Sequence, residues 1–309
     1  MNQYLPQIAI LLCTLDGGRF LRPQLDSIRP PDGCDCHIYL SDDGSRDDTQ
    51  QVARDYAESN DSVPLTLRRG PGAGHAANFL SLLNAPDVEA DFYAFSDQDD
   101  LWDANKLDVA LAALYTVDAD TAAVYCSRTR SISEAGADKG RSPRFRRPPS
   151  FANALIQNIA GGNTMVLNRK ARQLLVEAGR VEVVAHDWWV YQLVSGAGGR
   201  VIYDPEPHMS YRQHDRNAIG ANTGVQARGR RYLGFLSGRN RRWNQANLAA
   251  LKDNQRLLTP ENSELLQVFE RLRSDSLTTR LAALLGGPFY AQTLSGNIGL
   301  WLATLLKKI

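Results

Sequence analysis

The chain has few of the residues that would build a disulfide framework or a zinc site. Its 309 residues include four cysteines, Cys13, Cys34, Cys36 and Cys126. The nearest two in sequence lack the two-residue spacing that is typical of paired zinc ligands. We therefore expect reduced thiols in a cytoplasmic protein.

A strong net charge and a secretion signal are absent too. Lysine and arginine number 35 against 34 acidic residues, for a formal net charge of +1, so the composition does not favour nucleic acid as a partner. Residues 1–6 contain neither a basic segment nor a long apolar run, which argues against a cleaved leader. The length suits one large α/β domain with an appendage, or two modest domains.

Short apolar runs organise the first hundred residues. Residues 8–13 form a continuous apolar run that is typical of a strand buried on both faces. Three further short strands are predicted at 37–40, 64–67 and 91–95, with helical periodicity between them, for example at 50–56 and 79–83. Alternating strands and helices predict a parallel sheet whose ligands bind beyond the carboxyl ends of the strands.

Carboxylates follow three of these strands, at the edge where ligands are expected. The polar segments are Thr14 to Gly18, Ser41 to Ser45, and the acidic run Asp97-Gln98-Asp99-Asp100. Clustered carboxylates raise one another's pKa unless a cation or hydrogen-bond donors compensate them. Magnesium and manganese prefer such oxygen ligands, together with phosphate and water. We predict a divalent metal, Mn²⁺ or Mg²⁺, that binds phosphates at this edge.

Each of these segments, taken alone, also fits a different role. Residues 41–45 suit a helix cap equally well, and the first strand lacks the three-glycine fingerprint of dinucleotide-binding folds. A sugar nucleotidyltransferase would require a Gly-rich triphosphate loop with Arg and Lys, which residues 14–20 do not reproduce. A protein that is not an enzyme, a non-catalytic carbohydrate-binding subunit, is the alternative from another functional class.

The same segments resemble glycosyltransferase family 2. Residues 10–17 are similar to that family's opening strand and base-binding turn, residues 42–45 to its uridine or thymidine contact, and residues 97–99 to its metal-binding Asp-x-Asp motif. The string at 95–102 resembles the bacterial branch that contains rhamnosyltransferases of surface polysaccharide assembly. The resemblance covers about residues 1–220. It implies a GT-A fold, with a Rossmann-like, mostly parallel sheet flanked by helices, and sugar transfer with inversion at the anomeric carbon.

The resemblance also implies roles for individual residues. Those predicted to bind the nucleotide-sugar are Thr14, Asp16, Asp42, Asp43, Asn78, Asp97 and Gln98. The predicted metal ligands are Asp99 and His214, and the predicted diphosphate contacts are Arg212 and Arg216. The favoured donor is dTDP-rhamnose, with a UDP-hexose as the alternative, and the acceptor is a hydroxyl of a saccharide or lipid-linked glycan.

The acceptor side is predicted to lie around residues 160–189. Asp187 precedes two aromatic residues at a helix start and is the predicted catalytic base, although a carboxylate there would also favour the helix dipole. The predicted acceptor contacts are Gly162, Asn163 and Trp188, the last by stacking on a sugar ring. One of Trp188 and Trp189 is expected in the core.

The last ninety residues combine basic charge with apolar stretches. Residues 216–252 contain eight basic residues and no acidic one. Because no nucleic-acid-binding motif accompanies them, a surface that meets anionic lipids is favoured over one that binds nucleic acid. A solvated helical face is the third alternative. Residues 281–306 are uncharged, but Gly286-Gly287-Pro288 predicts two short helices instead of one span. Residues 298, 301, 302, 305 and 309 share one helical face, suited to a membrane surface, the catalytic domain or a second subunit.

These features predict two parts. Residues 1–220 are predicted to form the GT-A domain, with a nucleotide-sugar half at 1–102 and an acceptor half at 103–220. Residues 221–309 are predicted to form a helical region that is membrane-associated, at the inner face of the cell membrane, or makes a homo-oligomer.

Overall fold

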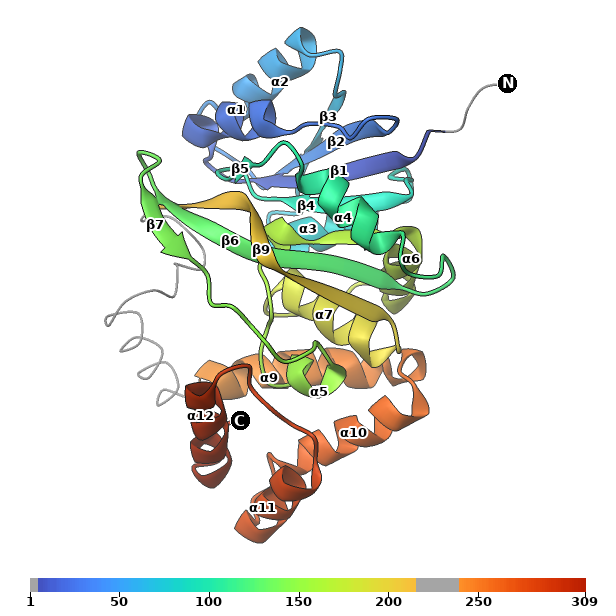
Figure 1. The fold of residues 1–309 in the computed structure, drawn as a ribbon, viewed down its shortest axis with the longest axis vertical. Helices are drawn as coiled ribbons and strands as arrows, with labels where there is room; N and C mark the ends of the chain where they lie inside the picture. Colours follow the sequence, from blue (N-terminus) through green and yellow to red (C-terminus); the bar gives the residue numbers. More distant parts are fainter. Residues whose placement is uncertain (1–4, 215–238) are drawn as a thin grey trace.

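The computed structural model describes residues 5–214 and 239–309, which form one sheet with helices on both faces and a helical C-terminal part (Figure 1). The strands are β1 Gln7–Thr14, β2 Asp35–Asp42, β3 Leu65–Arg69, β4 Phe92–Ser96, β5 Leu101–Trp102, β6 Ala123–Ser133, β7 Asp138–Arg141, β8 Val166–Asn168 and β9 Arg200–Gln213. The helices are α1 Gly18–Ser27, α2 Thr49–Ser59, α3 His75–Leu83, α4 Lys106–Leu114, α5 Phe151–Ala154, α6 Arg169–Ala178, α7 His186–Gly196, α9 Arg239–Asp253, α10 Pro260–Arg271, α11 Leu277–Gly286 and α12 Leu294–Leu305. Two short 3₁₀ turns, η1 Gly162–Thr164 and η2 Gln255–Leu257, complete the described elements.

The sheet has a parallel half and a mixed half. Its strand order is β3-β2-β1-β4-β8-β6-β9-β5, with β7 paired to β6. Strands β3, β2, β1 and β4 are parallel, which confirms the four strands and the βαβ pattern predicted from the sequence. Beyond β4 the sheet is less parallel than predicted, because β8 runs antiparallel to both β4 and β6, and β5 runs antiparallel to β9.

Alternating side chains of β1 fill two separate cores. Successive side chains of a strand point to opposite faces, and both faces of β1 are covered by helices. On one face Ile8, Ile10 and Leu12 join apolar residues of α1, α2 and α4. On the other, Ala9, Leu11 and Cys13 join α3, α6 and α7. Burial on both faces explains why the sequence of β1 is continuously apolar.

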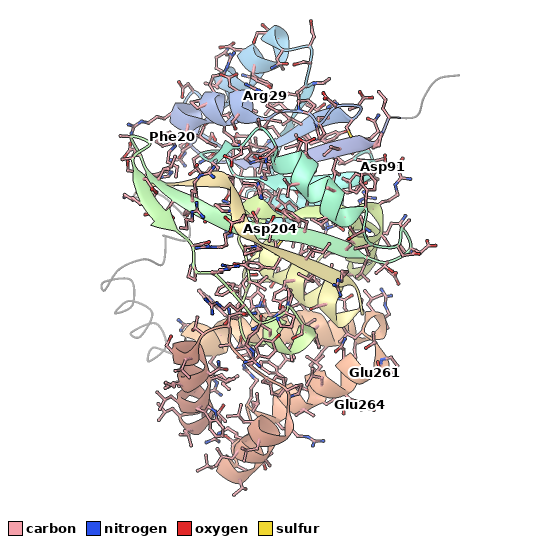
Figure 2. The ribbon with its side chains drawn as sticks, in the orientation of Figure 1. Phe20, Arg29, Asp91, Asp204, Glu261 and Glu264 are labelled. Carbon is pink, nitrogen blue, oxygen red and sulfur yellow. The ribbon has the colours of Figure 1, made fainter. Side chains whose placement is uncertain are left out.

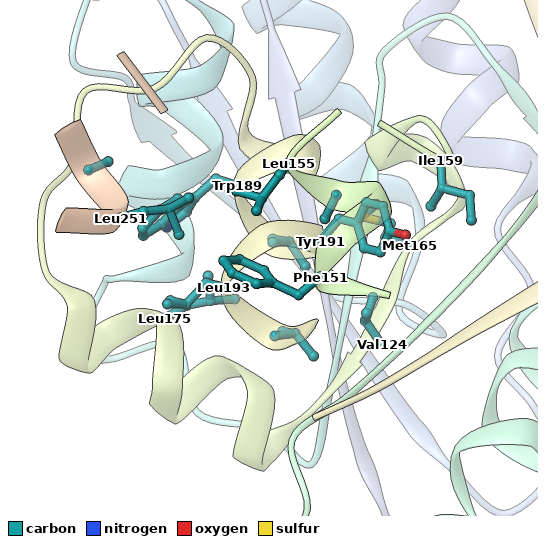
Figure 3. Packing of buried hydrophobic residues seen from close by; sticks show 14 of the residues in the cluster. Val124, Phe151, Leu155, Ile159, Met165, Leu175, Trp189, Tyr191, Leu193 and Leu251 are labelled. Carbon is teal, nitrogen blue, oxygen red and sulfur yellow. The ribbon is translucent and has the colours of Figure 1, made fainter. Parts of the chain in front are cut away.

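The C-terminal helices share the second core. Figure 3 shows Trp189 and Leu193 of α7 gathered with Leu251 of α9 in one buried cluster. Hydroxyl side chains cap three of these helices, since Thr259, Ser276 and Thr293 accept hydrogen bonds at the starts of α10, α11 and α12.

The two short helices predicted within 281–306 are confirmed as α11 and α12. Among the described residues, no helix combines the length and apolar character that a membrane crossing requires. The predicted domain boundary near residue 220 lies outside the described residues.

Candidate functional site

The polar segments predicted from the sequence meet at one edge of the sheet. Thr14, the last residue of β1, is paired in register with Asp42, the last residue of β2. Leu12 of β1 is paired with Ser96, the last residue of β4, so the acidic run at 97–100 begins beside the same strand ends. The parallel register therefore places all three segments on the edge where ligands of such sheets bind.

Asp42 and Asp43 both hold backbone in place. The buried Asp42 carboxylate accepts hydrogen bonds from Thr14 Oγ1 at 2.9 Å, from Gln50 Nε2 at 2.8 Å and from the Ser45 hydroxyl. Burial raises the pKa of Asp42, but these donors outweigh it and the pKa lies below the ordinary value. The neighbouring Asp43 carboxylate accepts from the backbone N–H groups of Gly72 at 2.6 Å and Gly74 at 3.0 Å. Both carboxylates thus shape the loops that surround the site.

Asp16 and Gln98 connect the loop after β1 to its neighbours. Asp16 accepts a hydrogen bond from the backbone N–H of Arg46 at 2.7 Å. Gln98 pairs with both backbone groups of Leu15: its Oε1 accepts from the N–H at 2.8 Å and its Nε2 donates to the carbonyl at 3.1 Å. A Cβ on Gly17 would lie 2.1 Å from Gln98 Oε1, so any larger residue there would displace this amide from Leu15.

Asn78 is buried behind this edge. Its Nδ2 donates to the carbonyl of Ser41 at 3.0 Å and its Oδ1 accepts from the Ser41 hydroxyl at 2.6 Å. Both polar ends of the side chain thus bind the end of β2. The structure therefore shows Asn78 as a buried support for the end of β2.

The carboxylates of the acidic run lie close together and are poorly solvated. Asp99 and Asp100 are buried. Burial, together with the charges of Asp99 and Asp187, raises the pKa of Asp97 to about 7. Burial, Asp97 and Asp99 raise the pKa of Asp100 well above its ordinary value. Such mutual repulsion is relieved when a cation binds.

Asp99 faces His214, as expected of two ligands of one metal. Asp99 Oδ2 lies 2.6 Å from His214 Nε2, and the His214 ring stacks on Phe20 with centroids 5.2 Å apart. Figure 2 shows Phe20 near the tip of the β6–β7 hairpin. Within 5–214 and 239–309, no three acidic, His or Cys side chains enclose a metal. A carboxylate and an imidazole nevertheless suit Mn²⁺ or Mg²⁺, because these ions take the remaining ligands from phosphates and water.

Arg212 closes the other side of the acidic run. Its Nε donates to the carbonyl of Asp99 at 3.1 Å and its Nη1 to the carbonyl of Glu134 at 2.7 Å. Its backbone N–H donates to Asp100 Oδ1 at 3.3 Å. Arg212, a predicted diphosphate contact, is therefore beside Asp99, while Arg216 lies outside the described residues.

Lys106 is a site residue that the sequence pattern did not predict. This lysine is 2% exposed and its Nζ donates to the carbonyl of Asn163 at 2.6 Å. Asn163 Nδ2 in turn donates to Asp100 Oδ2 at 2.5 Å. Burial lowers the pKa of Lys106, while Asp100 and Asp97 act against that shift. The only signal in the sequence is a lysine at the start of a mostly apolar helix soon after the acidic run.

Asp187 lies at the start of α7, close enough to the acidic run for its charge to contribute to the raised pKa of Asp97. Its Oδ2 accepts from the backbone N–H of Gly162 at 3.0 Å. Burial raises its own pKa, opposed by hydrogen bonds from backbone N–H groups. Gly162, Asn163 and Asp187 are thus brought together, as predicted.

The two tryptophans after Asp187 are both largely buried. Trp189 is fully buried in the core. Trp188 keeps 8% of its surface exposed, and its Nε1 donates to the carbonyl of Ala154 at 2.7 Å. The stacking role predicted for Trp188 is limited to this small exposed part of the ring.

His186 is buried without a hydrogen bond to either ring nitrogen from the described residues. Its ring stacks on Phe79 at 4.0 Å and meets Phe95 edge-on at 4.8 Å. A Cβ on Gly162 would lie 2.2 Å from His186 Nε2, so the ring packs directly under the acceptor segment. Burial, with a smaller effect from His75, lowers the pKa of His186 well below its ordinary value.

The neutral His186 ring should make the fold sensitive to acid. Below the unfolded-state pKa of about 6.5, the unfolded chain binds a proton that the folded chain excludes, so wild-type stability falls by up to about 1.4 kcal/mol per pH unit from this group. In His186→Leu that contribution is gone. The free energy of unfolding of the variant relative to wild type should rise as the pH falls from 7 to 5.5. Denaturant titrations at several pH values measure this, and parallel pH profiles would contradict it.

Comparisons with known proteins bear on the family and the fold. The family described as Glycosyl transferase family 2 matches residues 9–178. The dTDP-rhamnosyl transferase RfbG of Shigella flexneri is 28% identical over 236 residues, 73% of this chain and 78% of that protein. The mannosyltransferase PcManGT from Pyrobaculum calidifontis, solved with GDP-Man and Mn²⁺, has a TM-score of 0.52 at 17% identity and covers 99% of this chain and 89% of its own. S. aureus TarS with UDP-GlcNAc has a TM-score of 0.55 at 13% identity, over 97% and 90% of the two chains.

Proposed function

Since this chain belongs to glycosyl transferase family 2 and is a transferase of GT-A fold, we propose that it moves a sugar from a nucleoside diphosphate to an acceptor hydroxyl with inversion at the anomeric carbon. The observation that carries the proposal is the approach of two groups to the acidic run. Asp99 pairs with His214, and the charges of both Asp99 and Asp187 raise the pKa of Asp97, so the predicted metal pair and the predicted base both lie close to the acidic run. An in-line displacement requires a leaving-group site and a base on opposite sides of the reacting carbon.

On the donor side, the chain's own residues bind and orient the nucleotide-sugar. Asp43, which holds the loop at Gly72 and Gly74, would contact the base, and Asp97 would contact the sugar. Asp99 and His214 would hold Mn²⁺ or Mg²⁺, whose charge neutralises the departing diphosphate. Arg212 stands against the Asp99 backbone, where its guanidinium adds positive charge close to the same phosphates.

On the acceptor side, Asp187 removes the proton of the attacking hydroxyl. The Gly162 N–H fixes one carboxylate oxygen, so the carboxylate is held in a single orientation. A base whose pKa is raised by burial is better matched to a hydroxyl proton than an ordinary carboxylate. Gly162 and Asn163 would form the adjoining wall, so residues 103–220 would supply the acceptor side together with Arg212 and His214, and residues 1–102 the rest of the donor side.

The favoured substrates follow from the Shigella flexneri relative, which is described as a dTDP-rhamnosyl transferase. We propose dTDP-rhamnose as the donor, with a UDP-hexose as the alternative, and a saccharide or lipid-linked glycan of bacterial surface polysaccharide, such as O-antigen, as the acceptor. The proposed location is the cytoplasmic face of the cell membrane, where a lipid-linked acceptor would be found.

Slow donor hydrolysis tests this proposal without a known acceptor. The purified full chain is incubated with Mn²⁺ and, in separate reactions, dTDP-rhamnose, UDP-glucose, UDP-galactose and GDP-mannose. We expect dTDP-rhamnose to be hydrolysed about tenfold faster than the others, a selectivity of about 1.4 kcal/mol. A chelator should abolish the reaction and added Mn²⁺ should restore it. Donor binding without hydrolysis or transfer would favour the non-catalytic subunit, and sugar nucleotide formation from a nucleoside triphosphate would favour the nucleotidyltransferase.

A further inference from the structure

The last helix exposes a row of large apolar side chains. Leu294 of α12 is 80% exposed and Leu285, near the end of α11, is 72% exposed. The other exposed apolar residues of this region are Ile298, Trp301, Leu302, Leu305 and Leu306, each between 39% and 55% exposed. Contiguous apolar surface of this kind on a folded protein marks an interaction site.

The exposed row lies on the side of α12 that points away from the rest of the protein. Residues 294, 298, 301 and 305 recur at helical spacing along one side. The opposite side, with Leu300, Ala303 and Thr304, is buried against the rest of the chain. Arg280 of α11 fixes the helix in this orientation, because its Nε donates to the carbonyl of Thr304 at 2.8 Å and its Nη2 to that of Leu305 at 3.2 Å. The apolar row therefore faces outward in a helix that is firmly held.

A basic loop is bonded to the segment that precedes α12. The loop at 144–147 is fastened to the segment before α12: the Arg147 N–H donates to Gln292 Oε1 at 3.1 Å, and Gln292 Nε2 donates to the Arg147 carbonyl at 2.9 Å. The Arg147 guanidinium lies 3.7 Å from the centre of the Tyr290 ring. Arg144, Arg146 and Arg147 are exposed and line a hollow of about 360 Å³.

The carboxyl end of the face is basic as well. Lys307 and Lys308 follow α12, and Lys307 pairs with Asp275. Residues 276–309 contain no acidic residue. The acidic residues Glu261 and Glu264 of α10 lie on the opposite side of the helical part from α12 (Figures 1 and 2). Basic residues thus occur on both sides of α12, on the loop bonded to Gln292 before it and at Lys307 and Lys308 after it, where Asp275 pairs with Lys307.

We infer that this docking face, made of Leu285, Leu294, Ile298, Trp301 and Leu305 with the basic border Arg144, Arg146, Arg147 and Lys308, binds the surface of a bilayer that contains anionic phospholipids. The apolar row would enter the boundary between headgroups and acyl chains, and the basic border would meet lipid phosphates. A second copy of the chain suits the face less well, because two such faces in contact would bring their basic borders together. This inference rests on the proposed function, in which the acceptor is a lipid-linked glycan at the membrane.

Vesicle co-sedimentation of the full chain tests the docking face. Vesicles of phosphatidylcholine alone are compared with vesicles that also contain phosphatidylglycerol. Wild type should bind the anionic vesicles and release as salt is raised, with weak binding to the neutral ones. The double variant Ile298→Ser, Trp301→Ser should lower the partition coefficient at least about tenfold. The double variant Arg144→Ala, Arg146→Ala should lower it about fivefold or more for anionic vesicles only.

Matched controls keep the test specific. Tyr115→Ser removes an exposed aromatic side chain on α4, and Arg180→Ala removes an exposed arginine after α6. Both should bind vesicles as wild type does. Equal binding by all variants, or no binding by wild type, would overturn the inference. So would concentration-dependent self-association of wild type that the Ile298→Ser, Trp301→Ser variant loses, because the face would then join two copies.

Donor hydrolysis in the absence of vesicles separates this inference from the proposed function. The docking-face residues lie outside the site, so their variants should hydrolyse soluble donor at the wild-type rate. Normal hydrolysis without membrane binding would refute the docking face alone. Membrane binding without hydrolysis or transfer would refute the proposed transferase activity alone.

Discussion

Replacing Asp187 by Asn is expected to lower sugar transfer by roughly 100- to 10,000-fold, the usual contribution of a general base. The Asp187 carboxylate accepts from the backbone N–H groups of Gly162 and Trp188, and the single amide oxygen of Asn can accept from one of them, so circular dichroism must first show that the variant folds. The substitution should lower kcat and leave the affinity for the nucleoside diphosphate little changed, because Asp187 is assigned to the acceptor side. Steady-state kinetics and calorimetric titration with the nucleotide measure the two quantities.

A matched control for this substitution is Glu182→Gln, which removes an exposed carboxylate five residues earlier in the chain. It should transfer sugar at the wild-type rate. Near-normal turnover by a correctly folded Asp187→Asn protein would remove Asp187 from the role of base. The acceptor hydroxyl would then have to lose its proton to another group in the cleft.

Asp99→Asn should lower metal-supported transfer about 100-fold or more, since charge neutralisation at a leaving diphosphate contributes several kcal/mol. His214→Ala should have an effect of the same kind. Because Asp99 Oδ2 and His214 Nε2 are 2.6 Å apart, the two substitutions should not be additive: the double variant should be little worse than the poorer single one. Mn²⁺ titration of activity, with the apparent metal affinity of each variant, measures this.

The chain offers a matched pair for comparison. His208 Nε2 lies 3.1 Å from Asp204 Oδ2, midway along β9, and Figure 2 shows Asp204 away from the end of the sheet where Phe20 lies. Asp204→Asn and His208→Ala should leave the Mn²⁺ dependence unchanged. Chelator-insensitive activity of the wild type, or full additivity of Asp99→Asn and His214→Ala, would contradict a shared metal.

The parallel half of the fold could be predicted because its sequence pattern is long and clear. β1 is buried on both faces over its whole apolar run, and βαβ spacing leaves one arrangement of the neighbouring strands. The mixed half could not, since β5 has two residues and β8 three, too few for any periodicity to be visible. Their pairing depends on contacts between segments far apart in the chain.

For the site, sequence indicated which segments meet but not what each side chain binds. Asp42 and Asp43 fall at the predicted edge, yet their hydrogen bonds to loops of this chain became visible only in three dimensions. Lys106 was missed because a lysine in a helix is normally solvated, and only the packed fold shows that it is buried beside Asp100 and Asp97. The acidic run itself, with Asp99 at His214, was found because its carboxylates are adjacent in sequence.

The contacts between Lys106, Asn163 and Asp100 place a constraint on how this sequence can diverge. Asn163 donates to Asp100 and its carbonyl accepts from Lys106, so the segment beside Asp187 and the acidic run are one continuous buried network. Lys106 binds the backbone carbonyl of residue 163, which any amino acid supplies, whereas the bond to Asp100 requires a side-chain donor at position 163. Leaving a buried polar group without its partner costs about 1–3 kcal/mol. Position 163 is therefore constrained through Asp100 and not through Lys106, and a change of acceptor has to be accommodated around that contact.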